Sequence, residues 1–199
     1  LRKVSGVPAL QFSALGKVND VRKSRTLRPQ REGDLVYVVG KTGKELGGSE
    51  YYDYRGEIGS TVPRVDPDET RANYEFINSC IEKGIVESVH GIYRGGIGVS
   101  LAEMAIAGDV GLKIDLSEVP TDGSLDAWEI LYSESPSRFL ITVDPERKEE
   151  IDDLLVDCSG RNIGVIEGKE LLVKNQADEL MDVSIPELAD SYYRAFQSF

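Results

Sequence analysis

The stretch Ile85–Ala105 constrains the fold of this 199-residue chain more than any other part of the sequence. It passes from a strand-like run through a glycine-rich turn into a mostly apolar helical run, and such a helix is expected to be buried. At the turn, glycines let backbone N–H groups approach an anion, and a helix N-terminus favours negative charge. Arg94, Gly95 and Gly96 are therefore candidates for contacting a phosphate.

Apolar runs and helical patterns alternate along the rest of the chain. Leu35–Val39 is a short apolar run after Gly33-Asp34 and before Gly40, which predicts a strand buried on both faces. Asp66-Pro67 with Glu69 predicts a helix that begins with a capping box. The buried face of this helix is expected to carry Ala72, Phe76, Ile77, Cys80 and Ile81.

The other predicted elements complete an α+β pattern. The expected strands are Pro8–Leu15, Val110–Leu116 and Phe139–Val143, and Asn162–Glu167 with Glu170–Lys174 reads as a hairpin. Helices are expected after three cap signals, which are Ser124, Asp144-Pro145 and Ser184-Ile185-Pro186-Glu187. This order favours helices that cover a mixed sheet.

Composition narrows the choice of partners. Lys and Arg number 23 against 35 Asp and Glu, and the net charge of −12 disfavours nucleic acid. No apolar run approaches the roughly 20 residues of a membrane helix. Cys80 and Cys158 are far apart in sequence, so neither a zinc site nor a disulfide framework is expected. A reducing, cytoplasmic compartment is the default expectation.

A second polar group lies just before the strand Phe139–Val143. Residues 133–138 read Ser-Glu-Ser-Pro-Ser-Arg, and hydroxyls and a guanidinium are groups that hold a phosphate or ribose. Glu134, Ser135 and Arg138 are therefore binding candidates. A polar turn in which Glu134 and Arg138 pair with each other is the plainer alternative.

Two further loops carry weaker signals. Gly43 and Gly48 form a Gly-x-x-x-x-Gly pattern without the Gly-Lys-Ser/Thr of a Walker A loop, which favours a flexible turn. The stretch Val18–Gln30 and the preceding Lys17 are rich in Lys and Arg, and they form either a contact for a phosphate or partner or, more plainly, a solvated strand edge. The chain begins with Leu1 rather than methionine, so we expect a piece of a longer polypeptide.

Three segments together resemble phosphoribosylformylglycinamidine synthase, the ATP-dependent amidotransferase of purine biosynthesis. They are Glu45–Tyr51, Val89-His90 with Gly95–Met104, and Ser133–Phe139. The resemblance covers most of the chain, from about Gly16 to the final helix, and the combination is specific although each motif alone is modest. The wider superfamily includes aminoimidazole ribonucleotide synthetase, selenophosphate synthetase and hydrogenase-maturation proteins.

The resemblance implies a three-layer α/β/α domain with a mixed sheet, like the C-terminal domain of aminoimidazole ribonucleotide synthetase. The parent protein would have two homologous halves, each with an ATP-handling N-terminal domain, and this chain would be the second C-terminal domain. Residues 1–16 would supply the last strand of the missing N-terminal domain, and residues 17–199 the C-terminal domain. The parent would convert formylglycinamide ribonucleotide, ammonia from glutamine and ATP into the amidine, ADP and phosphate, with Mg²⁺ neutralising phosphate charge.

The family motifs also bear on single residues. In the catalytic half of the family, a Glu-Ser-Gln counterpart of Glu134-Ser135-Pro136 contacts the substrate, and proline replaces the amide here. The usual His-Asp-Val-Ser-Asp-Gly-Gly segment begins here with His90-Gly91 and has Arg94 at the second aspartate. The resemblance therefore implies neither a metal site nor a catalytic residue within this chain.

Three interpretations follow from the resemblance. The leading one is an enzyme domain that is silent alone and supports a nucleotide pocket at its junction with the missing N-terminal domains. The alternative is a structural or regulatory domain that holds a non-exchanging nucleotide and docks the glutaminase subunit. A selenophosphate- or hydrogenase-maturation-type enzyme is disfavoured, because this sequence lacks the segment with the catalytic Cys and Lys. A homodimer is a further expectation, since related domains pair through their sheets.

Overall fold

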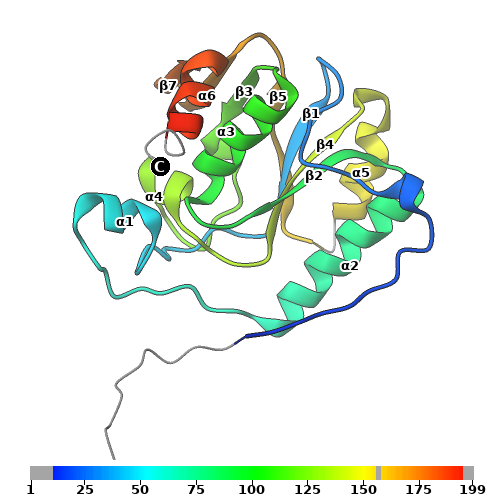
Figure 1. The fold of residues 1–199 in the computed structure, drawn as a ribbon, viewed down its shortest axis with the longest axis horizontal. Coiled ribbons are helices and arrows are strands. Elements are labelled where there is room, and N and C mark those ends of the chain that lie inside the picture. Colours follow the sequence, from blue (N-terminus) through cyan, green and yellow to red (C-terminus); the bar gives the residue numbers. More distant parts are fainter. Residues whose placement is uncertain (1–10, 156–157, 195–199) are drawn as a thin grey trace, which may run out of the picture.

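A computed structural model describes residues 11–155 and 158–194 (Figure 1). The strands are β1 (Leu35–Val39), β2 (Val86–Ile92), β3 (Leu112–Asp115), β4 (Arg138–Val143), β5 (Gly160–Ile166), β6 (Glu170–Asn175) and β7 (Asp178–Ser184). The α-helices are α1 (Glu50–Arg55), α2 (Pro67–Lys83), α3 (Gly96–Gly108), α4 (Ala127–Tyr132), α5 (Lys148–Leu154) and α6 (Ile185–Arg194). Short 3₁₀ turns are η1 (Val21–Lys23), η2 (Leu116–Glu118) and η3 (Pro145–Arg147).

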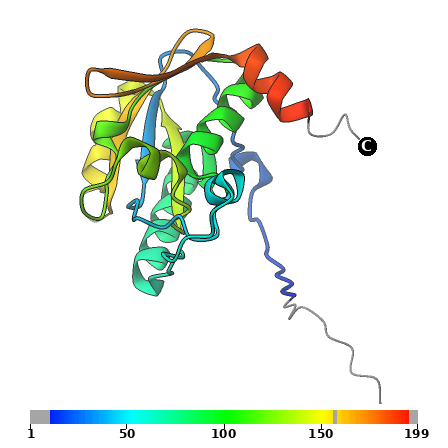
Figure 2. The ribbon, with the colours of Figure 1, turned by 90° about the vertical axis from the view of Figure 1, so that its left-hand side faces the viewer.

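The strands form one mixed sheet in the order β2-β4-β1-β5-β3-β6-β7. Neighbouring strands are antiparallel except β3 and β6, which are parallel. Helices cover both faces of the sheet (Figures 1 and 2). The predicted α+β fold with three layers and a mixed sheet is therefore confirmed.

Strand β1 lies inside the sheet, between β4 and β5, and contributes to two cores. Val36 and Val38 pack with α3 and α4 on one face, and Tyr37 and Val39 pack with α2 and α5 on the other. All four side chains are fully buried, which confirms the predicted burial on both faces. Alternate side chains of a strand point to opposite faces, so a single apolar run supplies both cores.

Helix α2 begins and ends where the sequence predicts. The Asp66 carboxylate accepts hydrogen bonds from two N–H groups of the first turn, and Gly84 closes the helix in the left-handed conformation. One predicted core residue is wrong, because Ala72 is exposed and Asn73 is buried instead. The helix turns Asn73 inward because its amide donates to the Ser137 carbonyl at 3.0 Å.

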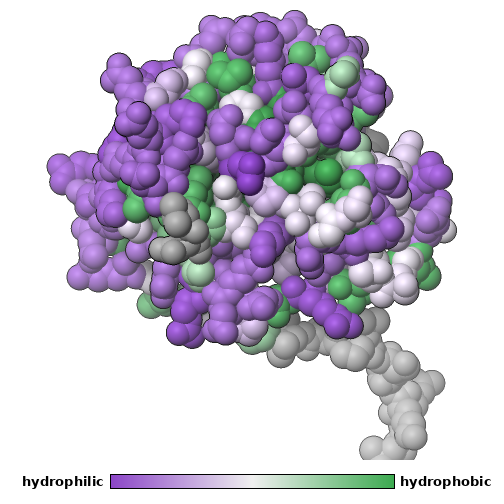
Figure 3. All heavy atoms as spheres, turned by 180° about the vertical axis from the view of Figure 1, so that it is seen from behind, coloured by the Kyte–Doolittle hydropathy of each residue, from purple (hydrophilic) through white to green (hydrophobic). Residues whose placement is uncertain are grey.

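Cys80 is a free thiol and lies in the core as predicted. Burial raises the pKa of the Cys80 thiol to about 11, so it stays protonated at neutral pH. No helix among the described residues combines the length and apolar character that crossing a membrane would require. The back of the molecule is largely hydrophilic, with apolar residues in small separate groups (Figure 3).

The caps of two later helices give a mixed result. The predicted Ser124 cap is wrong, because α4 begins after Asp126, which forms a capping box with Glu129. Asp126 is two residues closer to the start of α4 than Ser124. Its side chain can therefore reach the first-turn N–H groups, and that of Ser124 cannot. The box between Ser184 and Glu187 at the start of α6 is confirmed.

The predicted hairpin of Asn162–Glu167 and Glu170–Lys174 is wrong. Strand β3 lies between β5 and β6, and β6 forms its hairpin with β7 instead. The Gly111 N–H donates to the Gly168 carbonyl, so the connection curls around the start of β3 rather than making a tight turn. Strand β7 escaped prediction because an edge strand this polar lacks alternating apolar residues.

The predicted strand Pro8–Leu15 is absent over its described part. Residues 11–15 pair with no strand, and the Phe12 side chain is 84% exposed, whereas residues 8–10 lie outside the described residues. Strand-like residues need a neighbouring strand to satisfy their backbone groups. The basic stretch that follows runs beside edge strand β2, where the Val89 N–H donates to the Thr26 carbonyl and Arg25 donates to the Val86 carbonyl.

Candidate functional site

Three loops meet at one end of the sheet because β1, β4 and β2 are neighbours. Antiparallel pairing places Val39 opposite Phe139 and Ile92 opposite Arg138, so β1 and β2 end where β4 begins. The loop after β1, the β2–α3 turn and residues 133–137, here called the serine loop, therefore converge. All six predicted binding candidates lie in or directly beside the last two of these segments: Glu134, Ser135, Arg138, Arg94, Gly95 and Gly96.

Hydrogen bonds join the serine loop to the loop after β1. The Gly43 N–H donates to Ser135 Oγ at 2.9 Å, and the Glu45 N–H donates to Ser133 Oγ at 3.3 Å. The Glu134 N–H returns a bond to the Glu45 carbonyl at 3.0 Å. Ser133 and Ser135 are almost completely buried, so their hydroxyls satisfy the protein's own backbone.

Glu134 connects the starts of two helices. Its Oε1 accepts hydrogen bonds from the Glu50 N–H at 2.9 Å and the Gly95 N–H at 2.8 Å. These groups belong to the first residue of α1 and the N-cap of α3, and a carboxylate is favourable at both positions. The anion beside the Gly95 N–H is thus a side chain of the protein itself.

Gly96 brings the β2–α3 turn close to α4. Both Gly95 and Gly96 have positive φ, at 82° and 67°. A Cβ at position 96 would lie 2.5 Å from the Leu131 carbonyl oxygen, so only glycine allows this approach. The turn is therefore held in place by close packing as well as by Glu134.

Arg138 supports the serine loop from below. Only 1% of its surface is exposed, and its guanidinium donates to the Ser133 carbonyl at 2.6 Å, the Ser135 carbonyl at 2.9 Å and Thr42 Oγ1 at 2.8 Å. Burial lowers its pKa to about 10, against the opposing influence of Glu45 and Glu134, so the group remains a cation at neutral pH. Its contacts replace the alternative in which Arg138 pairs with Glu134, which is wrong.

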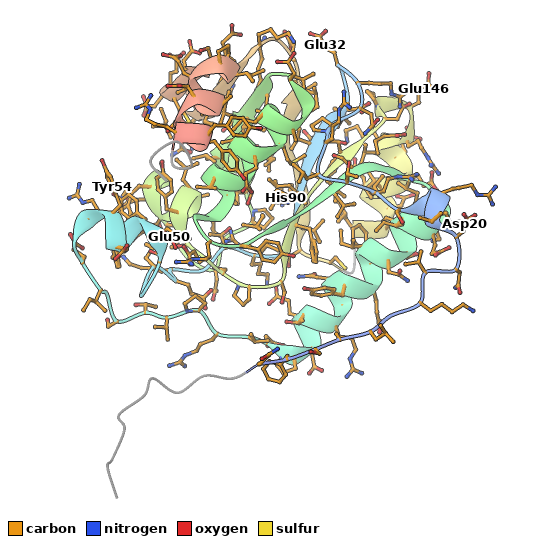
Figure 4. All side chains as sticks on the ribbon, viewed as in Figure 1. Asp20, Glu32, Glu50, Tyr54, His90 and Glu146 are labelled. Atoms are coloured by element: carbon orange, nitrogen blue, oxygen red, sulfur yellow. The ribbon has the colours of Figure 1, made fainter. Side chains whose placement is uncertain are left out.

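Arg94 faces solvent at the turn, with 82% of its side chain exposed, and it forms an ion pair with Glu50 of α1. Glu50 lies at the start of α1 in Figure 4. An exposed pair of this kind contributes little to stability, so Arg94 can exchange its partner at small cost. Of the predicted binding candidates, Arg94 is the cation best placed to meet an external anion.

A cleft of about 540 Å³ opens beside these loops. Its walls are the loop after β1, the α1–α2 connection, the start of α2 and the second half of the serine loop. Charges of both signs and several hydroxyl groups line it: Lys41, Lys44, Arg64, Glu45, Asp66, Glu69, Asp122, Thr61, Thr70, Ser135 and Ser137. Such a lining can bind a ligand that combines a phosphate with hydroxyl or amide groups.

Lys44 ties the cleft to α4 through an ion pair. Its Nζ lies 2.5 Å from Glu129 Oε1, and the other oxygen of Glu129 accepts the Asp126 N–H. Burial alone would raise the pKa of Glu129, but Lys44 and the Asp126 N–H more than offset it, so the pKa lies below its usual range. Glu129 of α4 thus fixes the position of Lys44 at its end of the cleft.

Several structural residues of the site carried no sequence signal of their own. Ser137 adopts a φ of 60°, and Thr70 Oγ1 lies 2.7 Å from its hydroxyl while Asn73 binds its carbonyl. Thr42 likewise receives Arg138. The one available hint was Asn73, an amide one residue from the apolar face of an amphipathic helix.

The described residues contain no group of three or more His, Cys, Asp or Glu side chains arranged to hold a metal ion.

His90 points from β2 toward α3 and is labelled in Figure 4. Its Nε2 lies 2.8 Å from Glu103 Oε2, so the pair links this strand to the helix.

Comparison with known proteins places the chain in a family. Residues 31–174 match the family model described as AIR synthase related protein, C-terminal domain. The phosphoribosylformylglycinamidine synthase subunit PurL of Thermococcus sibiricus is 35% identical over 185 residues, which is 93% of this chain and 26% of the relative. The subunit of the same name from Methanocaldococcus jannaschii is 33% identical over 193 residues, or 95% of this chain and 26% of the relative. The chain thus spans about a quarter of the length of these relatives.

Solved structures share the fold. A structure described as T. maritima PurL complexed with FGAR has a TM-score of 0.74 and 23% identity, covering 85% of this chain and 30% of that one. The same protein complexed with ATP has a TM-score of 0.71 and 24% identity, over 85% and 28% of the two chains. E. coli HypE, a hydrogenase maturation protein, has a TM-score of 0.59 and 18% identity, over 80% and 51%.

Proposed function

The chain belongs to the AIR synthase related proteins, of which it carries the C-terminal domain, and from this we propose that it is the second C-terminal domain of a phosphoribosylformylglycinamidine synthase. One observation carries the proposal. Each of the three segments that resemble the synthase, which are distant in sequence, includes part of one of the three loops that meet where β1 and β2 end and β4 begins. The loop parts of the motifs therefore coincide with the site, whereas Ile97, Leu101 and Met104 of the second motif are buried in the core.

In this proposal the domain forms one wall of a nucleotide pocket. Glu134, Ser135 and Arg138 set the shape of the serine loop, and Gly95 and Gly96 bring the β2–α3 turn up to it. Arg94 would contact a phosphate directly, since it is the exposed cation at that turn. The missing N-terminal domain would supply the opposite wall.

The full-length protein would use ATP and glutamine to convert formylglycinamide ribonucleotide into its amidine. ATP supplies the phosphoryl group that activates the amide oxygen, and Mg²⁺ neutralises phosphate charge. The described residues offer no metal-binding group, so the N-terminal domains would hold this ion. The role of this chain is to orient substrate and exclude water, and the glutaminase subunit would deliver the ammonia.

The test uses the full-length protein and the 199-residue chain side by side. We expect amidine formation that depends on ATP and glutamine with the full-length protein and its glutaminase, and no turnover by the isolated chain. Arg94→Met in the full-length protein is expected to raise the KM for the ribonucleotide. Turnover by the isolated chain, or an inactive full-length protein, would contradict the proposal.

A second candidate function has its own support in the sequence. Gly91, Arg94 and Pro136 replace residues that the family's catalytic half uses, which favours a structural or regulatory domain that holds a non-exchanging nucleotide and docks the glutaminase. Calorimetric titration with ADP and a pull-down with the glutaminase separate the two functions. Sedimentation of the chain tests the expected homodimer, and cell fractionation tests the expected cytoplasmic location.

A further inference from the structure

The connection between α1 and α2, residues 57–65, is here called the strap, and its backbone is fixed. The Gly48 N–H donates to the Ile58 carbonyl at 2.7 Å, and the Gly47 N–H donates to the Thr61 carbonyl at 2.8 Å. The Arg64 N–H donates to Glu45 Oε1 at 2.7 Å. These bonds seat the strap on the loop after β1, so it follows the cleft in one defined path.

The strap turns its apolar side chains toward solvent. Ile58 is 83% exposed, Val62 54% and Val65 64%. Tyr54, just before the strap, is 88% exposed and points away from the body of the protein in Figure 4. Exposure of several apolar side chains on an ordered segment is unfavourable in a lone domain and is typical of an interaction surface.

A second segment repeats this pattern. In residues 11–21, Phe12, Leu15, Val18 and Val21 are each at least 68% exposed. The two segments together hold seven of the fourteen large apolar side chains that are exposed in the described part of the chain, and Tyr54 beside the strap is an eighth, so the apolar exposure is concentrated. In Figure 1 the strap runs along the lower left edge of the molecule, and residues 11–21 run from the lower edge up the right-hand side.

We propose that the strap and residues 11–21 form the docking surface for the part of the full-length polypeptide that precedes this chain. The curated relatives are about four times as long as the region matched, so they contain a large partner within the same polypeptide. Residues 11–21 are the described segment nearest to that part of the sequence. The identity of the partner rests on the proposed function, whereas the surface rests on exposure and geometry.

Two features favour this occupant over a second copy of the chain. Each copy carries a net charge of −12, so self-association brings two strongly acidic bodies together. The strap also contributes Thr61 and Arg64 to the wall of the cleft. A partner on the strap would therefore lie beside the cleft, as a pocket shared between domains requires.

Hydrogen exchange of the full-length protein and of the 199-residue chain tests the surface without any substitution. We expect the amides of residues 54–66 to exchange about tenfold or more slowly in the full-length protein than in the chain. The variant Ile58→Ser/Val62→Ser/Val65→Ser is expected to remove this extra protection. Leu180→Ser, which changes an exposed apolar residue on β7, is the matched control and is expected to retain it.

Equal exchange in the full-length protein and the chain would overturn the inference. Protection that appears in the chain alone and grows with its concentration would also overturn it, because the occupant would then be a second copy. The assay is separate from catalysis. An active full-length protein without protection refutes only the docking surface, and an inactive one with protection refutes only the proposed function.

Discussion

The serine loop and the strap invert the usual distribution of polar and apolar side chains. The serine loop is polar yet mostly buried, with Ser133 and Ser135 almost inaccessible, whereas the strap carries Ile58 and Val62 in solvent. Both are ordered by hydrogen bonds rather than by apolar packing. The difference is that the side chains of the serine loop form hydrogen bonds within the domain, whereas the apolar side chains of the strap have no contact that buries them. The serine loop is a wall of the cleft whose buried polar groups are hydrogen-bonded, and the strap is a surface with exposed apolar area that a partner could bury.

Removing the Arg138 side chain, which holds the serine loop, should give the largest effect on stability. In Arg138→Met, the carbonyls of Ser133 and Ser135 and the Thr42 hydroxyl lose their donor inside the protein. We expect the free energy of unfolding to fall by about 3 kcal/mol or more, because several buried polar groups are left unsatisfied. Urea denaturation measures the change.

Arg161→Met is the matched control for this variant. It makes the same substitution at a largely exposed side chain whose partner, Glu118, is 3.9 Å away. We expect a change within about 0.5 kcal/mol. Equal effects of the two substitutions would show that Arg138 does not support the serine loop.

The pair between Lys44 and Glu129 gives a smaller, pH-dependent effect. The pKa of Glu129 is lowered in the folded protein, so the pair stabilises the fold at pH values above the unfolded pKa of about 4.3. This stability is lost as the pH falls through the lower, folded pKa. Glu129→Gln should therefore cost about 1 kcal/mol at pH 7, discounted because the Lys44 ammonium is largely in solvent.

Urea denaturation at pH 7 and at pH 3 tests this dependence. The difference between the parent chain and Glu129→Gln should shrink at the lower pH. Glu118→Gln, in an exposed pair, should change little at either pH. A difference that stays constant from pH 7 to pH 3 would mean that the charge of Glu129 plays no part.

The sequence predicted the elements whose signals are local. The apolar run Leu35–Val39 is an interior strand, and Asp66-Pro67 and Gly84 bound α2, because caps and apolar periodicity depend on a few neighbouring residues. The resemblance to the synthase family, and not a local pattern, predicted the three-layer architecture. The hairpin failed because strand neighbours are chosen by tertiary contacts, and nothing near Gly168-Lys169 reveals that β3 inserts between β5 and β6.

The sequence predicted which residues lie at the site but not the hydrogen bonds that hold them there. Glu134, Ser135 and Arg138 do lie together with Gly95 and Gly96. Their roles depend on β1 and β2 both pairing with β4, which no local pattern shows. The alternative pairing of Glu134 with Arg138 failed because Glu134 accepts N–H groups from α1 and the β2–α3 turn, whereas Arg138 donates to carbonyls of the serine loop and to Thr42. Whether these residues contact a ligand stays a prediction.

Substitutions in the strap should give the smallest change per residue in the isolated chain. Ile58→Ser/Val62→Ser/Val65→Ser removes side chains that are already more than half exposed, so the free energy of unfolding should change by less than about 0.5 kcal/mol per residue. Thermal unfolding of the chain and of the full-length protein measures the effect. In the full-length protein the same substitutions should destabilise more, because the docked partner would bury these side chains. A variant that destabilises both proteins equally would show that the strap packs within this domain, and the contrast with the serine loop would then vanish.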